Sequence, residues 1–241
     1  MTTLYGWGPM FDCPSPSPYV MKTDIQLQML DIEFDRAIAD LDSVSKHKAP
    51  YVEDDGEIIE DSNFIRAHFE KKLGRSLMDG LTRQQQAQSW AFERMAEGHL
   101  AAVMAGERWM NDANFAKGPA MFFAGAPEPM RSQIIRETRD NIRETRYGSG
   151  IGRHSHAEQL QLAAWDIAAI AAQLGEQTFL FGDEPTVADA SVSAVLISSA
   201  TPYFDTPLTD LITQHANLVR YMKRMRESYL ADGVWPELMA A

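Results

Sequence analysis

The chain has 241 residues, 45% of them hydrophobic, and its 22 basic and 34 acidic side chains give a formal net charge of −12. This composition is typical of a globular protein with one large domain or two modest ones. The acidic balance argues against nucleic-acid partners and anionic membrane surfaces, which attract concentrated Lys and Arg. No apolar run is long enough for a membrane span, and no signal peptide or presequence is expected. The single cysteine, Cys13, excludes an internal disulfide and favours a reducing compartment such as the cytoplasm.

The first part of the chain mixes strand and helix signals. A short apolar run at 4–7 predicts a buried strand, and a proline-rich loop follows it. A helix is predicted from Pro18 to about residue 31, because proline is tolerated in a first helical turn and Ser17 is a good N-cap. Residues 32–35 predict a second strand.

A hairpin and a helix are predicted next. The Asp55-Gly56 pair is a strong turn signal and lies between two short strand-like runs, so residues 50–59 are predicted to form a hairpin. Asp61 and Ser62 are typical of a helix start, and this helix is expected to reach about residue 73.

From about residue 84 the periodicity becomes helical. One broad apolar face is predicted by Leu160, Ala163, Ala164, Ile167, Ala168, Ala171 and Leu174. Strand signals are nearly absent after Ile59. We therefore predict a β/α domain over residues 1–75, a linker over 76–83 and an all-helical domain over 84–241.

The segment 48–62, KAPYVEDDGEIIEDS, carries the most chemical information. A strand that opens at Pro50 leaves the backbone of Ala49 able to pair with an extended peptide ligand, provided that the bond between them is cis. The helix that begins near Ser62 offers free N–H groups and a hydroxyl to a carboxylate, and Asp61 beside it is suited to an ammonium group. A peptide ligand with an α-carboxylate and an α-amine, such as glutathione, fits this pattern, although Asp61 and Ser62 also suit a plain helix cap.

This segment resembles the glutathione-binding segment of glutathione S-transferases. Its sequence is similar to that of the metaxin-like branch, which includes the failed-axon-connections and cadmium-responsive proteins. Three further stretches resemble the same branch or the wider superfamily: SPSPY at 15–19 with Lys22, GSGIGRHS at 148–155, and FGDEPTVAD at 181–189. In the last of these Thr186 and Asp189 form a capping box.

The resemblance implies a fold and a set of binding residues. The fold is an α/β thioredoxin-like N-terminal domain followed by an all-α C-terminal domain. Ala49 before Pro50 would pair with the cysteinyl part of glutathione, Asp61 and Ser62 would hold its γ-glutamyl end, and Lys48 or Lys46 would meet its glycyl carboxylate.

Three residues are candidates for stabilising the glutathione thiolate. Ser17 combines a hydroxyl with a helix N-terminus, and both favour the anion; it could also be only an N-cap. Cys13 in the proline-rich loop is the first alternative, and Tyr5 near the end of the first strand is the second. Dithiol chemistry is not expected, because the Cys-Pro-Tyr-Cys pattern of glutaredoxin-like proteins is replaced by Ser17-Pro18-Tyr19-Val20.

Other site residues are less firmly indicated. Arg153 could point into the cleft toward an anion or could cap and bridge helices. The histidines lack metal-ligand spacing, so we predict no metal site. Met10, Phe11 and the stretch 115–123 are candidates to line an electrophile site, although such residues are more often core.

The predicted function is that of a glutathione transferase acting on a small hydrophobic electrophile, with glutathione as co-substrate. Lyase, dehalogenase, isomerase and reductase variants would share the glutathione site. The alternatives are a non-catalytic metaxin-like scaffold and a Cys13-centred thiol reductase. The resemblance also implies a homodimer.

Overall fold

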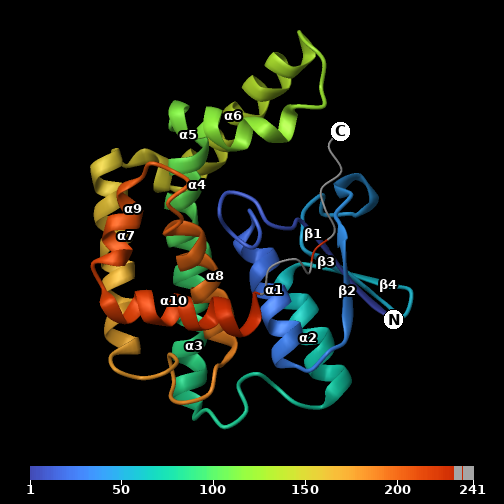
Figure 1. The fold of residues 1–241 in the computed structure, drawn as a ribbon, viewed down its shortest axis with the longest axis vertical. Coiled ribbons are helices and arrows are strands. Elements are labelled where there is room, and N and C mark those ends of the chain that lie inside the picture. The colour runs from blue at the N-terminus through green and yellow to red at the C-terminus, as the bar shows by residue number, and fades with distance from the viewer. Residues whose placement is uncertain (231–234, 236–241) are drawn as a thin grey trace.

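The computed structural model describes residues 1–230 and residue 235, which form two parts packed side by side (Figure 1). The first part comprises β1 (Thr2–Gly6), α1 (Pro18–Met29), β2 (Phe34–Ile38), a 3-10 turn (Leu41–Ser43), β3 (Tyr51–Asp54), β4 (Glu57–Glu60) and α2 (Ser62–Leu73).

One four-stranded sheet organises this first part, with the strand order β2-β1-β3-β4. β1 is parallel to β2 and antiparallel to β3, and β3 and β4 form the predicted antiparallel hairpin. At the hairpin tip Asp55 and Gly56 have φ of +52° and +87°, the left-handed conformation that tight turns require. Helices α1 and α2 share a core with the sheet, formed by Leu4, Leu27, Leu30, Val52, Ile59, Ile65 and Phe69. This arrangement confirms the thioredoxin-like fold.

The second strand begins two residues later than the sequence predicts, at Phe34 instead of residue 32. The reason is the end of α1. Asp31 adopts a φ of +57°, and the Ile32 amide donates to the Leu27 carbonyl at 3.0 Å. Residue 32 therefore closes the helix before the chain can join the sheet.

Asp54, at the end of β3, is a buried carboxylate with three donors. Thr2 Oγ1, His68 Nε2 and Lys72 Nζ lie 2.7, 2.8 and 2.6 Å from its oxygens. Burial by itself would raise the pKa of Asp54, but the hydrogen bonds from Lys72, His68 and Thr2 outweigh it and lower this pKa to about 2.

Asp54 should therefore make stability fall in acid. Because its folded-state pKa lies below the ordinary value of 3.8, its contribution is present above that value and is lost as the pH falls toward 2. We expect Asp54→Asn to remove about 2 kcal/mol of the wild-type loss in unfolding free energy between pH 6 and pH 2. Urea denaturation at several pH values measures this, with exposed Asp35→Asn as the control. Equal acid slopes for wild type and Asp54→Asn would contradict the assignment.

The second part is helical, and extended strands are absent between residues 61 and 230. Its elements are α3 (Arg83–Met95), a π-helical turn (Ala96–Leu100), α4 (Ala101–Trp109), α5 (Asp112–Lys117), a 3-10 turn (Pro119–Phe123), α6 (Met130–Ser149), a 3-10 turn (Ile151–Arg153), α7 (His156–Leu174), α8 (Val187–Ser199), α9 (Pro207–Thr213) and α10 (Ala216–Tyr229). Among the described residues, no helix is both long enough and apolar enough to cross a bilayer.

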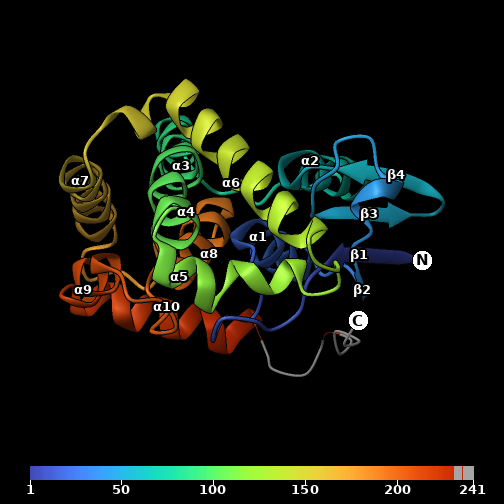
Figure 2. The same cartoon turned by 90° about the horizontal axis from the view of Figure 1, so that it is seen from above.

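The helices pack around α8, which is buried along its whole length. Seen from above, α6 crosses the molecule from its start on the side of the sheet to its end on the side of α7 (Figure 2). On α7 the predicted apolar face holds for Ala163, Ile167, Ala171 and Leu174, whereas Ala168 is exposed and Ile170 is buried in its place. The buried stripe is thus rotated slightly from the predicted one.

The two parts meet where α1 packs against α8. Lys22 of α1 is 1% exposed at this junction, and its Nζ donates to Asn63 Oδ1 of α2 and to Glu97 Oε1 of the π-helical turn, both at 2.7 Å. A buried charge requires such partners, and losing one is costly. This ion pair therefore fixes how the two parts approach each other.

Candidate functional site

Two cavities adjoin at the junction of the two parts. The first, here called the polar pocket, has a volume of about 410 Å³ and is lined by Tyr19, Lys48, Ala49, Pro50, Asp61, Ser62, Asn63, Arg94, Glu97 and Gly98. The second, the apolar pocket, has a volume of about 680 Å³, and its lining includes Trp7, Phe11, Pro16, Ser17, Pro18, Met104, Arg108, Trp109 and Phe122. Tyr19 and Glu97 line both pockets, so a ligand in one reaches the border of the other.

The polar pocket brings together five residues that the sequence predicts as a binding set: Lys48, Ala49, Pro50, Asp61 and Ser62. They are neighbours because Tyr51 pairs with Glu60 in the hairpin, which places the start of β3 beside the start of α2. The Ala49–Pro50 bond is cis. Neither the amide nor the carbonyl of Ala49 has a hydrogen-bond partner in the described chain, so both can pair with a ligand backbone.

Asp61 and Ser62 differ in how they are already engaged. Asp61 caps α2 by accepting from the Asn63 amide at 3.0 Å, and it accepts from Lys48 Nζ at 2.7 Å. Burial would raise the pKa of Asp61, but Lys48 and the Asn63 amide lower it overall, so the residue is a carboxylate at neutral pH. Ser62 is a buried residue that lines the polar pocket, and its hydroxyl makes no hydrogen bond within the described residues. The site thus offers one anion and one unused hydroxyl at a helix N-terminus.

Asp61 also has an unusual backbone, with a φ of +83°. Such values are uncommon and strained for a residue with a side chain, and strained backbone is enriched at functional sites. Nothing in the local sequence predicts this conformation.

Ser17 lies at the N-terminus of α1 and lines the apolar pocket close to its border with the polar one. Its Oγ accepts from the Val20 amide at 3.4 Å, which confirms it as the N-cap. Because the Oγ acts only as an acceptor in this cap, its proton remains able to donate to an anion. Tyr19 donates its hydroxyl to the Glu97 carbonyl at 3.0 Å, and burial raises the pKa of Tyr19 to about 12.

The two alternative thiolate-stabilising residues lie outside both pockets. Cys13 is 2% exposed, its Sγ is 3.8 Å from the Ile197 carbonyl, and burial raises the pKa of its thiol. Tyr5 stacks on Tyr51 with ring centroids 4.6 Å apart and donates to Glu53, and burial raises its pKa as well. The geometry therefore favours Ser17 over both.

Arg153 is not brought to the polar pocket. Its Nε donates to the Tyr147 carbonyl at 3.0 Å, and its guanidinium lies 4.8 Å from the Tyr147 ring centroid. The chain leaves α6 through Gly150 at a φ of +99°, which folds residue 153 back onto the end of that helix. Of the two predicted roles, the contacts of Arg153 match that of a residue that caps a helix end.

Sequence reasoning did not single out Asn63, Arg94 and Glu97 as pocket residues. Glu97 is held from two sides, by Lys22 at 2.7 Å and by Arg94 at 2.9 Å. One available signal was Lys22 itself, a cation in a helix whose neighbouring positions Val20, Met21 and Ile25 are apolar. Such a lysine requires an acidic partner from elsewhere in the fold.

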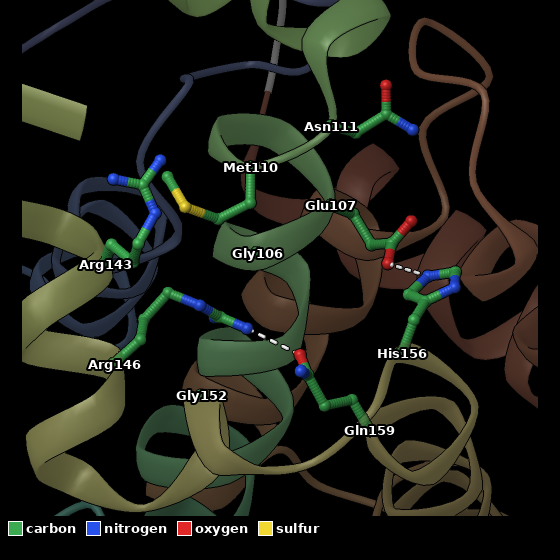
Figure 3. Close-up of a pocket in the computed structure, with 9 residues that line it drawn as sticks. All are labelled: Gly106, Glu107, Met110, Asn111, Arg143, Arg146, Gly152, His156 and Gln159. Atoms are coloured by element: carbon green, nitrogen blue, oxygen red, sulfur yellow. Dashed lines mark hydrogen bonds and ion pairs between the residues drawn. The ribbon is translucent and has the colours of Figure 1, made fainter. Parts of the chain in front are cut away.

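A third cavity of about 410 Å³ lies between α4, α6 and α7 (Figure 3). Arg143 and Arg146 of α6 line one side, and Glu107 with His156 line the other, with 2.6 Å between Glu107 Oε1 and His156 Nε2. Arg146 is buried and donates to Gln159 Oε1 at 2.6 Å. None of the predicted site residues lines this cavity.

Comparisons with known proteins agree with this geometry. The model of the glutathione S-transferase N-terminal domain matches residues 18–114, and that of the glutathione S-transferase C-terminal domain matches residues 163–225. The isoprene-epoxide–glutathione S-transferase of Rhodococcus sp. (strain AD45) is 32% identical over 236 residues, which cover 95% of this chain and 99% of that protein.

Two further similarities concern the branch and the fold. Failed axon connections of Drosophila melanogaster is 29% identical over 93% of this chain, which spans 56% of that longer protein. A solved glutathione S-transferase of Methylobacterium radiotolerans, in complex with glutathione sulfonate, aligns with a TM-score of 0.61 and 20% identity over 100% of this chain and 98% of that one.

Proposed function

The chain belongs to the glutathione S-transferase family, and from this premise we propose that it is a glutathione transferase that joins the thiolate of glutathione to a small apolar electrophile. The observation that carries the proposal is the pair of adjoining pockets. A polar pocket built from the predicted glutathione residues shares Tyr19 and Glu97 with a larger apolar pocket whose wall includes Ser17. Thiol and electrophile would therefore meet at that border.

Each polar-pocket residue has a role that its contacts allow. The free amide and carbonyl of Ala49 pair with the cysteinyl backbone of glutathione. Ser62 and the N-terminus of α2 hold the γ-glutamyl carboxylate, and Asp61 holds the ammonium group. Lys48, whose side chain is 52% exposed and pairs with Asp61, is free to turn toward the glycyl carboxylate when the ammonium group replaces it.

The transfer itself needs no metal. The thiol proton leaves to solvent, and Ser17 stabilises the thiolate by donating its hydroxyl proton in a hydrogen bond. With an epoxide, the sulfur attacks a ring carbon, the S–C bond forms as the C–O bond breaks, and the alkoxide takes a proton from water. The name of the Rhodococcus relative supports epoxides as the first electrophiles to try.

Calorimetric titration with reduced glutathione and a conjugation assay with small epoxides test the proposal. We expect micromolar-to-millimolar binding and a conjugation rate that Ser17→Ala lowers about 10-fold, because the thiolate loses a charged hydrogen bond. Affinity should change little, since the rest of glutathione is held elsewhere. Cys13→Ala, which alters a residue outside both pockets, is the comparison variant.

The alternatives predict other outcomes. No binding at several millimolar glutathione would favour a metaxin-like scaffold, a reading supported by the similarity to Failed axon connections. Activity lost in Cys13→Ala but retained in Ser17→Ala would favour a thiol reductase.

We also propose a cytoplasmic homodimer. The single cysteine supports the compartment, and the exposed Phe64 and Trp90 support a dimer. These two residues flank the Asn63–Arg94 contact at 3.4 Å, so a partner could cover both. Sedimentation equilibrium that gives a monomer mass would remove the dimer, and cell fractionation tests the compartment.

A further inference from the structure

A buried cation lines the apolar pocket without an acidic partner among residues 1–230. Arg108 of α4 is 5% exposed and is the one basic residue among the described residues of this lining. Its Nη1 donates to the Pro16 carbonyl at 3.0 Å and its Nη2 to the Ser198 carbonyl at 2.5 Å. Its Nε has no hydrogen-bond partner, and no carboxylate of the described chain pairs with the guanidinium. The groups around this charge are therefore backbone carbonyls, aromatic faces and the thiol of Cys13, and none of them is an anion.

This charge lies next to the predicted position of the thiolate. The Pro16 carbonyl that it binds belongs to the residue before Ser17, and Arg108, Pro16 and Ser17 line the same pocket. The rings of Phe204 and Phe11 lie 4.9 and 6.0 Å from the guanidinium carbon and exclude water from it. A desolvated positive charge that lacks a counterion favours an anion nearby.

We propose that Arg108 stabilises the thiolate of bound glutathione by its charge and positions Ser17 through the Pro16 carbonyl. The inference rests on the proposed function, and it adds a residue from the helical part to a thiolate site otherwise built from the first part. The proton lost from the thiol goes to solvent, as in that function. Arg108 acts at a distance, so it is a positioning and charge-stabilising residue.

The other ionisable groups that face this region do not supply a competing charge. Glu97 is paired with Lys22 and Arg94, at 2.7 and 2.9 Å. Tyr19 has its pKa raised to about 12, and burial raises the pKa of the Cys13 thiol, so both are neutral near pH 7. Arg108 is therefore the uncompensated charge beside Ser17.

Titration of the thiolate ultraviolet absorbance of bound glutathione tests the inference, with S-methylglutathione as the blank to remove Cys13 and tyrosine signals. In Arg108→Gln, which removes the charge but can still donate to a carbonyl, we expect the pKa of the bound thiol to rise by about one pH unit. Conjugation below that pKa should fall about 10-fold and recover as the pH is raised. Arg108→Lys, which keeps the charge, should retain most of the wild-type thiol pKa.

Arg146→Met is the matched control, because Arg146 is another buried arginine that donates to a backbone carbonyl, that of Ala102, but lines the third cavity. It should leave the thiol pKa unchanged. Thermal unfolding of each variant is recorded first, and Arg108→Met replaces the Gln variant if the latter is unfolded.

Two failures are distinguishable. Wild-type protein that binds no glutathione overturns the proposed function together with this inference. Wild-type binding with an unchanged thiol pKa in folded Arg108→Gln or Arg108→Met overturns only the role of Arg108, and would leave it a structural link between the Pro16 loop and α8.

Discussion

Ser62→Ala is expected to weaken glutathione binding about 30-fold and to leave thermal stability unchanged. Ser62 is the first residue of α2 and is 4% exposed, and its hydroxyl makes no hydrogen bond within the described residues. A hydrogen bond to a ligand carboxylate is worth roughly 2 kcal/mol, which corresponds to about 30-fold in affinity. Because the hydroxyl has no partner in the described part of the chain, its removal should cost the fold nothing. Calorimetric titration and thermal denaturation measure the two quantities.

Ser89→Ala is the matched control for this result. Ser89 is also a buried serine whose hydroxyl has no partner in the described chain, but it lies on α3 and lines neither pocket. Its variant should bind glutathione like wild type. Asp61 is a poorer test, because it also caps α2 and holds Lys48. Equal affinities of Ser62→Ala and wild type would place the γ-glutamyl end of glutathione elsewhere.

The fold was predictable where its cause is local. The hairpin follows from Asp55-Gly56, and the start of α2 follows from Asp61 and Ser62, because turn and cap preferences act over a few residues. The predicted start of β2 was two residues too early. The amide of Ile32 donates to the Leu27 carbonyl and so still belongs to the end of α1. No composition pattern records that bond.

In the candidate site, too, local features were predictable and contacts between distant segments were not. Its predicted residues between 48 and 62 meet because one hairpin joins them, so reading the segment was sufficient. Glu97 and Arg108 reach the pockets only because the π-helical turn and α4 pack on α8, which in turn packs against α1. The expectation that Arg153 points into the cleft differs from the structure. Its glycine-rich surroundings suggest a flexible loop, whereas the chain folds back onto the end of α6. The periodicity of the sequence does not predict contacts between distant segments.

Asp189 supports α8, the helix against which α1 packs. It is fully buried at the third position of α8 and closes the predicted capping box by accepting from the Thr186 amide at 2.7 Å and the Thr186 hydroxyl at 2.9 Å. It also accepts from the Leu180 amide at 2.9 Å and the Tyr221 hydroxyl at 3.0 Å. One carboxylate thus ties together the loop before α8, the start of α8 and α10.

Asp189→Ala is therefore expected to lower the free energy of unfolding by about 4 kcal/mol, because it leaves several buried donors unsatisfied at about 1–3 kcal/mol each. Urea denaturation measures this loss. Glu158→Ala is the control, since Glu158 closes the same kind of box with Ser155 on the exposed start of α7. That variant should lose about 1 kcal/mol, because water can replace the missing acceptor. Similar losses in both variants would mean that the cap alone, and not the buried network that joins α8 to α10, stabilises this part of the fold.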